Sequence, residues 1–407
     1  MMRIAFVSVS DQLGGSEAML LQTAAELRRF RPDWDLHVVV PGDGPLSARA
    51  AALGMQVSTL PMPGSLARMG ESGLSRGRAG AGGIMLARAA LSLPAYERQL
   101  RDLLSAIGPD IVHTNGIKAH VLSSRVRTPA RAIVWHMHEY ISRRPLTRRL
   151  IKHYAGRCSL MVANSESVAA DVRSVTGAGA EVRVIYNAVD LDRFSPVGPV
   201  ADLDALAGLT PAPEGTVRVG LVATFSRWKG HETFLRAVAS LPSSLMVRPY
   251  IVGGALYDTD RSQYSADELR AVAASYGLAG RVGFTGFVES ADRAMRALDV
   301  VVHASTSPEP FGLVIAEAMA CGRALVTSAT GGAAELVRAG EDAVTHRSGD
   351  AADLAAAIAA LASDPAARLR LGAQARAVAA RRFDARRLAG DFAVAYEAAA
   401  RLAVSPA

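Results

Sequence analysis

The sequence predicts an α/β protein built from two Rossmann-like domains, each with a parallel sheet. Three observations support this fold class. The chain has 407 residues, which is long for one domain and suits two of ordinary size. Short apolar runs alternate with stretches of helical periodicity, which is typical of a parallel sheet covered by helices on both faces. This alternation is interrupted once by proline-rich sequence and then begins again.

The apolar runs predict the order of the strands in each half. A helical pattern over 18–29 follows the first run. The expected strands of the first half lie at 1–9, 38–40, 111–113, 133–135 and 160–163. Those of the second half lie at 217–222, 249–252, 282–284, 300–302 and 324–326. Ligands of such sheets bind at the carboxyl ends of the strands, so we expect the site in a cleft between the two domains.

Proline-rich segments at 194–199 and 210–213 mark the junction of the halves. They predict a first domain over 1–196 and a second over 197–380. The remaining segment, 381–407, is predicted to be a helix that packs back on the first domain.

Residues 63–90 contain seven glycines among Ser, Arg and Met. This composition is compatible with a loop or lid and equally with an ordinary surface excursion.

The positive charge is confined to the first half. Residues 1–200 contain 24 Lys and Arg against 16 Asp and Glu, whereas 201–407 contain 21 against 22. The excess is concentrated in a basic cluster of Arg143, Arg144, Arg148, Arg149, Lys152 and Arg157. Such a cluster can meet an anionic membrane surface or an acidic substrate, or can simply be a solvated helix face. No zinc-finger spacing or aromatic-rich basic motif is present, so no nucleic-acid partner is expected.

Hydropathy and cysteine content indicate the compartment. The apolar start is too short for a signal peptide, and no uncharged apolar stretch reaches 18 residues. Cys158 and Cys321 are far apart and lack paired spacing, as expected of free thiols in a reducing compartment. We therefore expect a cytoplasmic protein, peripheral on the inner face of the cell membrane if the basic cluster binds lipid.

The segment from Ser307 to Gly322 carries the clearest chemical signal. It reads S-P-E-P-F-G-L-V-I-A-E-A-M-A-C-G and follows the expected strand 300–302. A helix beginning near Gly312 would present free backbone N–H groups, which suit a diphosphate. Glu309 before the helix and Glu317 within it could then bind two sets of hydroxyls. The simpler alternative is that Glu309 caps the helix and Glu317 is solvent-exposed.

This segment resembles the E-x7-E motif of glycosyltransferase family 4 (group 1), whose members have the two-domain GT-B fold and are generally retaining and metal-independent. The resemblance implies that the first domain faces the acceptor and the second the donor. It also implies that Glu309 contacts the donor sugar and Glu317 the ribose. The backbone around Phe311, Gly312 and Leu313 would hold the phosphates.

Other segments resemble the family in the expected order and together extend over nearly the whole chain. The loop of Gly14, Gly15, Ser16 and Glu17 resembles the amino-terminal G-G-x-E loop, which implies contact with the donor phosphates or the acceptor. Asn187-Ala188-Val189-Asp190 resembles the N-G-V-D segment before the linker, with Ala188 in place of glycine. Loops containing Gly253, Phe284 and Phe287 resemble those around the base and phosphates.

The basic clamp for the diphosphate departs from the family pattern. Lys229 in Lys229-Gly230 matches the family's lysine, but Thr224 occupies the position of its arginine. Arg227 is close enough in sequence to supply the missing charge. Cations are needed here because departure of the nucleotide leaves negative charge on the diphosphate.

His138, directly after the expected strand 133–135, resembles the histidine that contacts the sugar or the leaving phosphate. His136 is an alternative for this role. Two histidines could bind a metal, but no third ligand is evident, and no metal is expected. Asn115 and Lys118 follow the preceding strand and are candidates for acceptor contacts.

These features predict a retaining glycosyltransferase that moves a hexose-type sugar from a UDP- or GDP-linked donor to a glycan or lipid-linked acceptor. Synthesis of a cell-surface polysaccharide or glycolipid would be its context, and no cofactor is expected beyond the donor. A non-catalytic nucleotide-sugar-binding protein and a related GT-B epimerase remain alternatives. A dinucleotide-dependent oxidoreductase is disfavoured, because the first loop lacks G-x-G-x-x-G spacing.

Overall fold

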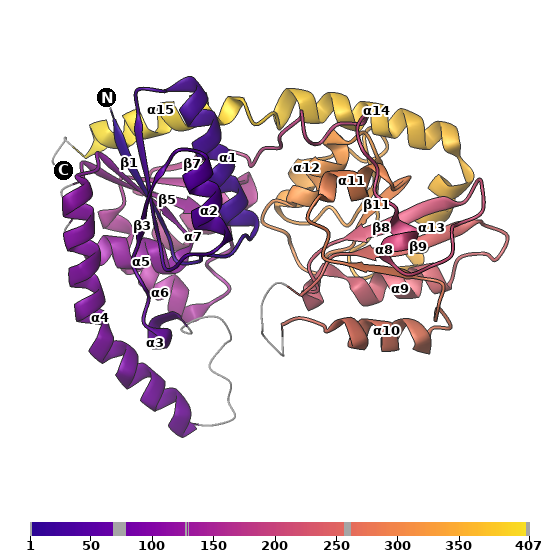
Figure 1. The fold of residues 1–407 in the computed structure, drawn as a ribbon, viewed down its shortest axis with the longest axis horizontal. Helices are drawn as coiled ribbons and strands as arrows, with labels where there is room; N and C mark the ends of the chain where they lie inside the picture. The colour runs from indigo at the N-terminus through magenta and orange to yellow at the C-terminus, as the bar shows by residue number, and fades with distance from the viewer. Residues whose placement is uncertain (1, 68–78, 127, 129, 256–261, 404–407) are drawn as a thin grey trace. The chain divides into compact units, whose positions relative to one another are not determined.

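The apolar runs form two separate parallel sheets, as the sequence predicts, and each sheet is flanked by helices (Figure 1). The computed structural model describes residues 2–67, 79–126, 128, 130–255 and 262–403. The chain divides into two compact units. Unit 1 comprises Met1–Asn187 and Ala385–Ala407, and unit 2 comprises Ala188–Asp384.

Unit 1 contains a seven-stranded parallel sheet of order β3-β2-β1-β4-β5-β6-β7 within the described residues. Its strands are β1 (Arg3–Ser8), β2 (Asp35–Val40), β3 (Gln56–Thr59), β4 (Ile111–Asn115), β5 (Ala132–Met137), β6 (Leu160–Ala163) and β7 (Val182–Val184). Its helices are α1 (Gly15–Phe30), α2 (Pro45–Ala52), α3 (Gly64–Ala67), α4 (Ala79–Ile107), α5 (Ile117–Arg125), α6 (Pro145–Tyr154), α7 (Glu166–Thr176) and α15 (Arg387–Leu402).

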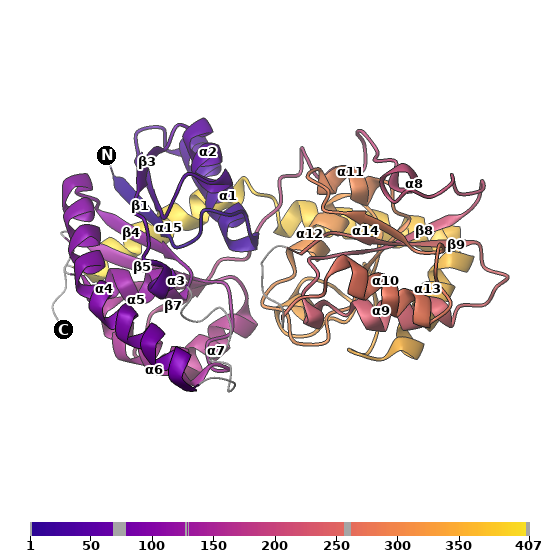
Figure 2. The ribbon, with the colours of Figure 1, turned by 60° about the horizontal axis from the view of Figure 1, so that its bottom comes forward.

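Alternating side chains along the central strands separate the two faces of the unit 1 sheet. Val112 on β4 packs in a cluster with α4 and α5, whereas its neighbour His113 contacts Phe392 and Tyr396 of α15. Helices α1 and α15 therefore cover one face and α4 to α7 the other (Figures 1 and 2). The last helix of the chain, α15, thus packs on the sheet of the amino-terminal unit.

Unit 2 contains a six-stranded parallel sheet of order β10-β9-β8-β11-β12-β13 within the described residues. Its strands are β8 (Val217–Val222), β9 (Val247–Val252), β10 (Gly283–Gly286), β11 (Val300–His303), β12 (Ala324–Thr327) and β13 (Val344–Thr345). Its helices are α8 (Leu203–Leu206), α9 (His231–Ala239), α10 (Ala266–Ser275), α11 (Ala291–Arg296), α12 (Leu313–Ala320), α13 (Ala351–Ser363) and α14 (Pro365–Arg382), with short 3-10 turns at Arg227–Lys229 and Gly332–Glu335.

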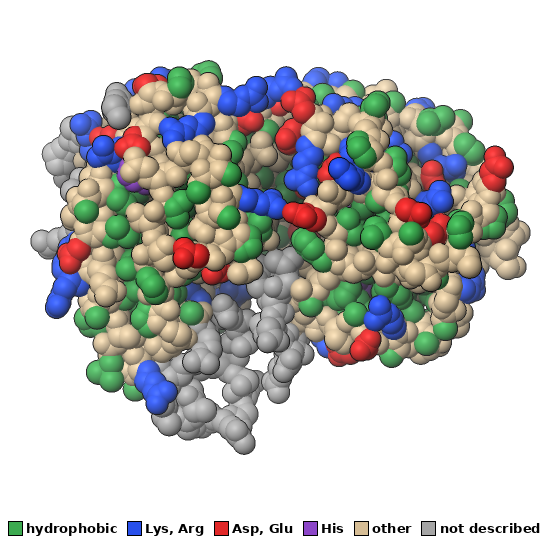
Figure 3. Space-filling view, viewed as in Figure 1, with side chains coloured by type: hydrophobic (Ala, Val, Ile, Leu, Met, Phe, Trp, Pro, Cys, Tyr) green, Lys and Arg blue, Asp and Glu red, His purple; other side chains and the backbone are tan. Residues whose placement is uncertain are grey.

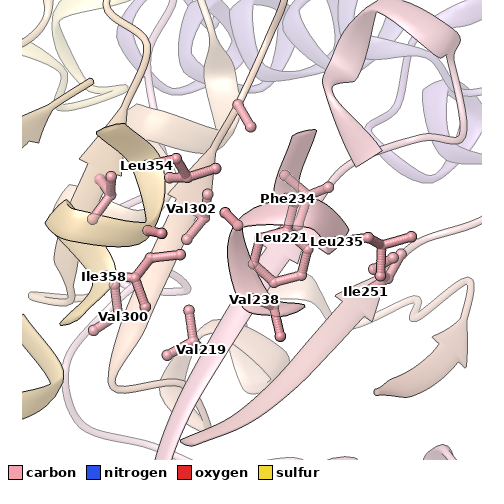
Figure 4. Packing of buried hydrophobic residues seen from close by; sticks show 14 of the residues in the cluster. Val219, Leu221, Phe234, Leu235, Val238, Ile251, Val300, Val302, Leu354 and Ile358 are labelled. Atoms are coloured by element: carbon pink, nitrogen blue, oxygen red, sulfur yellow. The ribbon is translucent and has the colours of Figure 1, made fainter. Parts of the chain in front are cut away.

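The core of unit 2 is formed by aliphatic side chains between the sheet and helices α9, α10 and α13. Figure 4 shows this packing, with Leu221 and Val302 from adjacent strands facing Phe234 and Ile358 from the helices. All four side chains are at most 1% exposed. This core holds the ends of β8 and β11 in a rigid frame, which matters because the candidate site lies in the loops that follow them.

Contacts within unit 2 place residues 188–196 with this unit rather than with the first. Val189 forms a bridge with Asp384, and its N–H donates to the carbonyl of Phe383 at 2.7 Å. Arg376 of α14 also donates to the carbonyl of Phe194. The units therefore separate after Asn187 and again after Asp384, whereas the sequence suggested 196 and 380.

The glycine-rich segment 63–90 is not a single loop. Helix α3 begins at Gly64, and α4 begins at Ala79 and continues to Ile107. Residues 68–78 of this segment lie outside the described residues. Helix α4 therefore includes Gly80, Gly82 and Gly83 despite the cost of about 1 kcal/mol for each glycine in a helix.

Candidate active site

The loops that carry the predicted donor residues lie at one edge of the unit 2 sheet. All its strands run parallel, so their carboxyl ends meet at the same edge. The loop after β8 carries Lys229, that after β11 carries Glu309, and that after β12 carries Gly331. These segments are distant in sequence, and hydrogen bonds join them directly in the structure.

Lys229 and Glu309 form a salt bridge at this edge. Lys229 Nζ lies 2.7 Å from Glu309 Oε1 and 3.0 Å from Oε2. The lysine side chain is 19% exposed and the glutamate side chain 8%, so the pair is largely shielded from water. The ammonium also lies 4.1 Å from the centre of the Trp228 ring, an additional electrostatic stabilisation.

Close backbone packing explains why glycine follows the lysine. Gly230 has φ +79°, and a Cβ there would lie 1.9 Å from the carbonyl oxygen of Ala304. The N–H of Thr306 also donates to the carbonyl of Trp228 at 2.7 Å. Only glycine permits the loop after β8 to press so closely on the loop after β11, and this approach brings Lys229 to Glu309.

The backbone of Glu309 is held independently of its side chain. It forms a parallel bridge with Gly331, in which its N–H donates to Thr330 and its carbonyl accepts from the N–H of Gly332. Helix α12 then begins at Leu313 with Gly312, at φ +91°, as its N-terminal cap residue. The expected helix start near Gly312 is confirmed, and Glu309 makes side-chain contacts other than helix capping.

His303 and Ser305 also contact the Glu309 carboxylate, and neither was predicted from the sequence. His303 Nε2 lies 3.3 Å from Glu309 Oε2, and Ser305 Oγ donates to the same oxygen at 2.8 Å. Burial raises the pKa of Glu309, but the charge of Lys229 and the interactions with His303 outweigh it and lower the pKa to about 2. Glu309 is therefore a carboxylate at any pH near neutrality. The sequence signal for these two residues was that polar side chains, His303 and Ser305, alternate at the end of the apolar run of β11.

Glu317 on α12 differs sharply from Glu309. Its side chain is half-buried rather than solvent-exposed. Burial raises the pKa of Glu317 to about 8, opposed by the charge of Arg193 and reinforced by that of Asp292. A carboxyl group with this pKa changes its charge near physiological pH.

Arg227 lies at the start of the turn that ends in Lys229, but its guanidinium has other partners. Its Nη2 donates to Glu268 Oε1 of α10 at 3.1 Å, and the guanidinium lies 4.2 Å from the centre of the Tyr264 ring. Thr224, at the position of the family's arginine, lies 3.3 Å from the hydroxyl of Ser226. Contact of Arg227 with a diphosphate stays a prediction.

The remaining predicted donor residues occupy the same edge with different exposure. Gly253 directly follows β9. Phe287 directly follows β10 and is 71% exposed, whereas Phe284 within β10 is half-buried beneath the guanidinium of Arg270. Phe311 is buried against Phe383, so only its backbone is available to a ligand.

Unit 1 brings together two of its predicted residues at the ends of β4 and β5. His138 Nε2 lies 2.8 Å from Asn115 Oδ1, and burial lowers the pKa of His138 to about 4. His138 is therefore neutral at pH 7. The alternative, His136, is 1% exposed and its ring packs against Phe392, so it belongs to the core. Lys118 donates through Nζ to the carbonyl of Ala67.

The predicted glycine loop precedes α1. The N–H of Gly14 donates to Glu17 Oε2 at 3.2 Å, and Gly15 is exposed with no atom within 4 Å of a Cβ placed on it. The backbone of Gly14 is therefore held by Glu17, and the space beside Gly15 is open. Over the part of the chain that the structure describes, no three His, Cys, Asp or Glu side chains are grouped to hold a metal ion.

Two Rossmann-like units, the second with a lysine and a carboxylate paired in the loops that follow its strands, are typical of the GT-B class of protein. The family profiles agree with this class. Residues 13–193 match the profile described as Glycosyltransferase Family 4, and residues 210–378 match that described as Glycosyl transferases group 1. The chain belongs to this family of glycosyltransferases.

Individual relatives are similar over different lengths. The chain is 34% identical over 216 residues to D-inositol 3-phosphate glycosyltransferase of Mycobacterium sp. (strain JLS), covering 52% of this chain and 47% of that protein. It is 31% identical over 218 residues to the lipopolysaccharide core biosynthesis glycosyltransferase LpsE of Rhizobium meliloti (strain 1021), covering 54% and 58%. The matches thus span about half the length of these curated relatives.

A solved structure is similar over the whole chain. Anabaena Alr3699/HepE, in complex with UDP and glucose, superposes with a TM-score of 0.78 at 26% identity, covering 98% of this chain and 100% of that one. The same protein has also been solved with UDP-glucose, at a TM-score of 0.77.

Proposed function

We propose that this protein is a retaining glycosyltransferase that moves a hexose-type sugar from a UDP-linked donor to a glycan or lipid-linked acceptor. The observation that carries the proposal is the Lys229–Glu309 pair at the carboxyl edge of the unit 2 sheet. It places a cation beside a carboxylate that is ionised near neutral pH, with the start of α12 close in sequence. The UDP and UDP-glucose complexes of the similar Anabaena protein support UDP over GDP.

The two charged groups have different tasks in this proposal. Lys229 and the backbone N–H groups at the start of α12 stabilise the diphosphate, on which negative charge grows as the bond to the sugar breaks. Glu309 accepts hydrogen bonds from hydroxyls of the sugar and opposes the positive charge that develops on its ring. Glu317 binds the ribose hydroxyls, and Phe287 offers an exposed aromatic face for the base.

Retention follows from substitution on one face of the sugar. The acceptor oxygen forms a bond to the anomeric carbon on the side from which the diphosphate departs. The bond from that carbon to the β-phosphate oxygen breaks, its electron pair stays on the diphosphate, and a phosphate oxygen takes the acceptor's proton. Inversion of the anomeric configuration in the product, read by NMR, would contradict this pathway.

Unit 1 supplies the acceptor side of the proposal. His138 is neutral because of its lowered pKa, and its Nε2–H donates to Asn115, so its unprotonated Nδ1 can accept a hydrogen bond from a hydroxyl without adding charge. Asn115 fixes the ring of His138 through a hydrogen bond. Lys118 and the loop at Gly14 and Gly15 are the further candidates for acceptor or phosphate contacts.

The ribose assignment predicts pH-dependent donor binding. We expect UDP-glucose to raise the melting temperature, and its affinity to increase about tenfold between pH 7 and pH 9. The reason is the raised pKa of Glu317, near 8, because only the ionised carboxylate can accept hydrogen bonds from both ribose hydroxyls. Thermal shift and calorimetric titration at several pH values measure both quantities.

Two variants serve as controls for this prediction. Glu317→Gln removes the titrating group and should bind UDP-glucose weakly and equally at both pH values, whereas Glu232→Gln, on the exposed side of α9, should behave as wild type. A wild-type protein that is folded but not stabilised by UDP-glucose, UDP or GDP would refute the proposed donor site.

We also propose that the basic cluster on and around α6 binds anionic lipids at the inner face of the cell membrane. Helix α6 lies between α5 and α7 (Figure 2) and carries exposed Arg148, Arg149 and Lys152 beside an exposed Leu146. No acidic residue interrupts residues 140–157. Elsewhere, on the face shown in Figure 3, basic and acidic side chains are intermixed. None of the described helices is long and apolar enough to cross a bilayer.

Flotation with liposomes tests this docking. We expect binding to vesicles that contain phosphatidylglycerol but not to neutral vesicles, with loss in 0.5 M salt because charges of this kind are screened. Arg148→Glu with Arg149→Glu should abolish binding. Arg236→Glu with Arg281→Glu changes the net charge equally on exposed positions of unit 2 and should leave it intact. Equal loss in both double variants would show that only net charge matters.

A further inference from the structure

A chain of hydrogen bonds leads from the interior of unit 2 to the carboxylate of Glu309. Thr327 Oγ1, at the end of β12, lies 3.0 Å from His303 Nδ1. His303 Nε2 lies 3.0 Å from Ser305 Oγ, and Ser305 Oγ lies 2.8 Å from Glu309 Oε2. His303 and Ser305 are 3% and 0% exposed, so this chain is shielded from water.

The last part of this chain has a definite direction. The Ser305 hydroxyl donates to the carboxylate of Glu309, so its oxygen accepts from Nε2–H of His303. At the other end of the chain, Thr327 Oγ1 contacts Nδ1 of His303 and accepts the N–H of Ala329 at 3.1 Å. Hydrogen bonds aligned in this way polarise one another, which strengthens the last of them.

The contacts from Ser305 and His303 fix the orientation of the Glu309 carboxylate, not the position of its backbone. The backbone of Glu309 is already held by its bridge to Gly331 and by hydrogen bonds to Thr330 and Gly332. The side chain could still rotate about its own bonds. Ser305 and His303 remove this freedom by holding Oε2, while Lys229 lies nearer to Oε1, at 2.7 Å, than to Oε2.

We propose that His303 and Ser305 are positioning residues that orient the Glu309 carboxylate toward the donor sugar and thereby determine which hexose epimer is accepted. The inference rests on the proposed function, because it takes Glu309 as the group that binds sugar hydroxyls. A fixed carboxylate accepts a hydroxyl of one orientation and leaves its epimer without a partner. A rotating carboxylate adjusts to both.

The test compares recognition of the sugar with recognition of the nucleotide. His303→Leu removes the chain, His303→Gln retains a donor near the position of Nε2, and Ser305→Ala removes the last donor. For each variant we would measure the affinity for UDP, and the rates of hydrolysis of UDP-glucose and its C4 epimer UDP-galactose. UDP lacks the sugar, so its affinity reports the nucleotide site without the hydroxyls that Glu309 is proposed to bind.

We expect His303→Leu and Ser305→Ala to bind UDP within twofold of wild type. Their preference between the two epimers should fall about tenfold, the effect of losing one hydrogen bond to a charged group. His303→Gln should recover most of the preference, and Glu309→Gln should lose it completely.

The outcomes separate this inference from the function on which it rests. Wild-type protein that neither binds UDP nor distinguishes the epimers overturns the proposed function, and this inference with it. A functional wild type whose preference is unchanged in His303→Leu and Ser305→Ala overturns the inference alone. A parallel loss of UDP affinity and of rate, with the epimer preference intact, shows a general structural role and also overturns it.

Discussion

Lys229→Ala is expected to reduce the rate of donor cleavage by about 10²- to 10³-fold, the effect of removing one group that stabilises a developing oxyanion. The ammonium is the cation adjacent to Glu309 at the edge of the sheet, and it is held there by the turn at Gly230. UDP release from UDP-glucose, measured without acceptor, gives the rate. Arg236→Ala, at an exposed position of α9 outside the predicted site, is the matched control.

The same variant should also destabilise unit 2. Removal of Lys229 leaves Glu309 as a buried charge without its main partner, at a cost of about 3 kcal/mol, and should raise the pKa of Glu309. Lys229→Ala combined with Glu309→Gln should regain most of this stability but none of the activity. Undiminished activity in Lys229→Ala, or a double variant less stable than the single one, would contradict this account of the pair.

Acidification is expected to destabilise unit 1 steeply below about pH 6.5. Burial lowers the pKa of His113 to about 3 and that of His138 to about 4, and it lowers those of His120 and His136 well below the usual value. Above pH 6.5 these groups are neutral in both the folded and the unfolded chain, so they have no effect. Below it the unfolded chain takes up protons that the folded chain does not.

Each such histidine costs about 1.4 kcal/mol per pH unit until the pH reaches its pKa in the folded protein. Because the pKa of His113 is about 3 in the folded protein, its hydrogen bond with the Tyr396 hydroxyl of α15, 2.7 Å from Nδ1, should persist until unit 1 unfolds. Melting temperatures from pH 7.5 to pH 5 measure the effect. His136→Phe should reduce the slope, and His153→Ala, at an exposed position of α6, should not. A melting temperature independent of pH would contradict the prediction.

Much of this architecture was predictable from periodicity alone. Short apolar runs between helical patterns correctly indicated most strands of both sheets, because strands buried on both faces must be apolar throughout. The short edge strands β3, β7 and β13 were missed, since they are less buried and lack such runs. The helix over 79–90 was also missed, because glycines that favour a loop precede the part of α4 that packs against the core.

The sequence by itself determined the fold class, the family, and the presence of Lys229, Glu309 and Glu317 in loops or helices that follow parallel strands. These features depend on local patterns and on chain order. Only the tertiary structure decided the partners of these groups. It showed that His303 and Ser305 hold Glu309, and that Arg227 pairs with Glu268. It also gave two nearby glutamates opposite pKa shifts. The physical reason is that hydrogen bonding, burial and charge act over a few ångströms in space, between residues that the sequence separates by up to 80 positions.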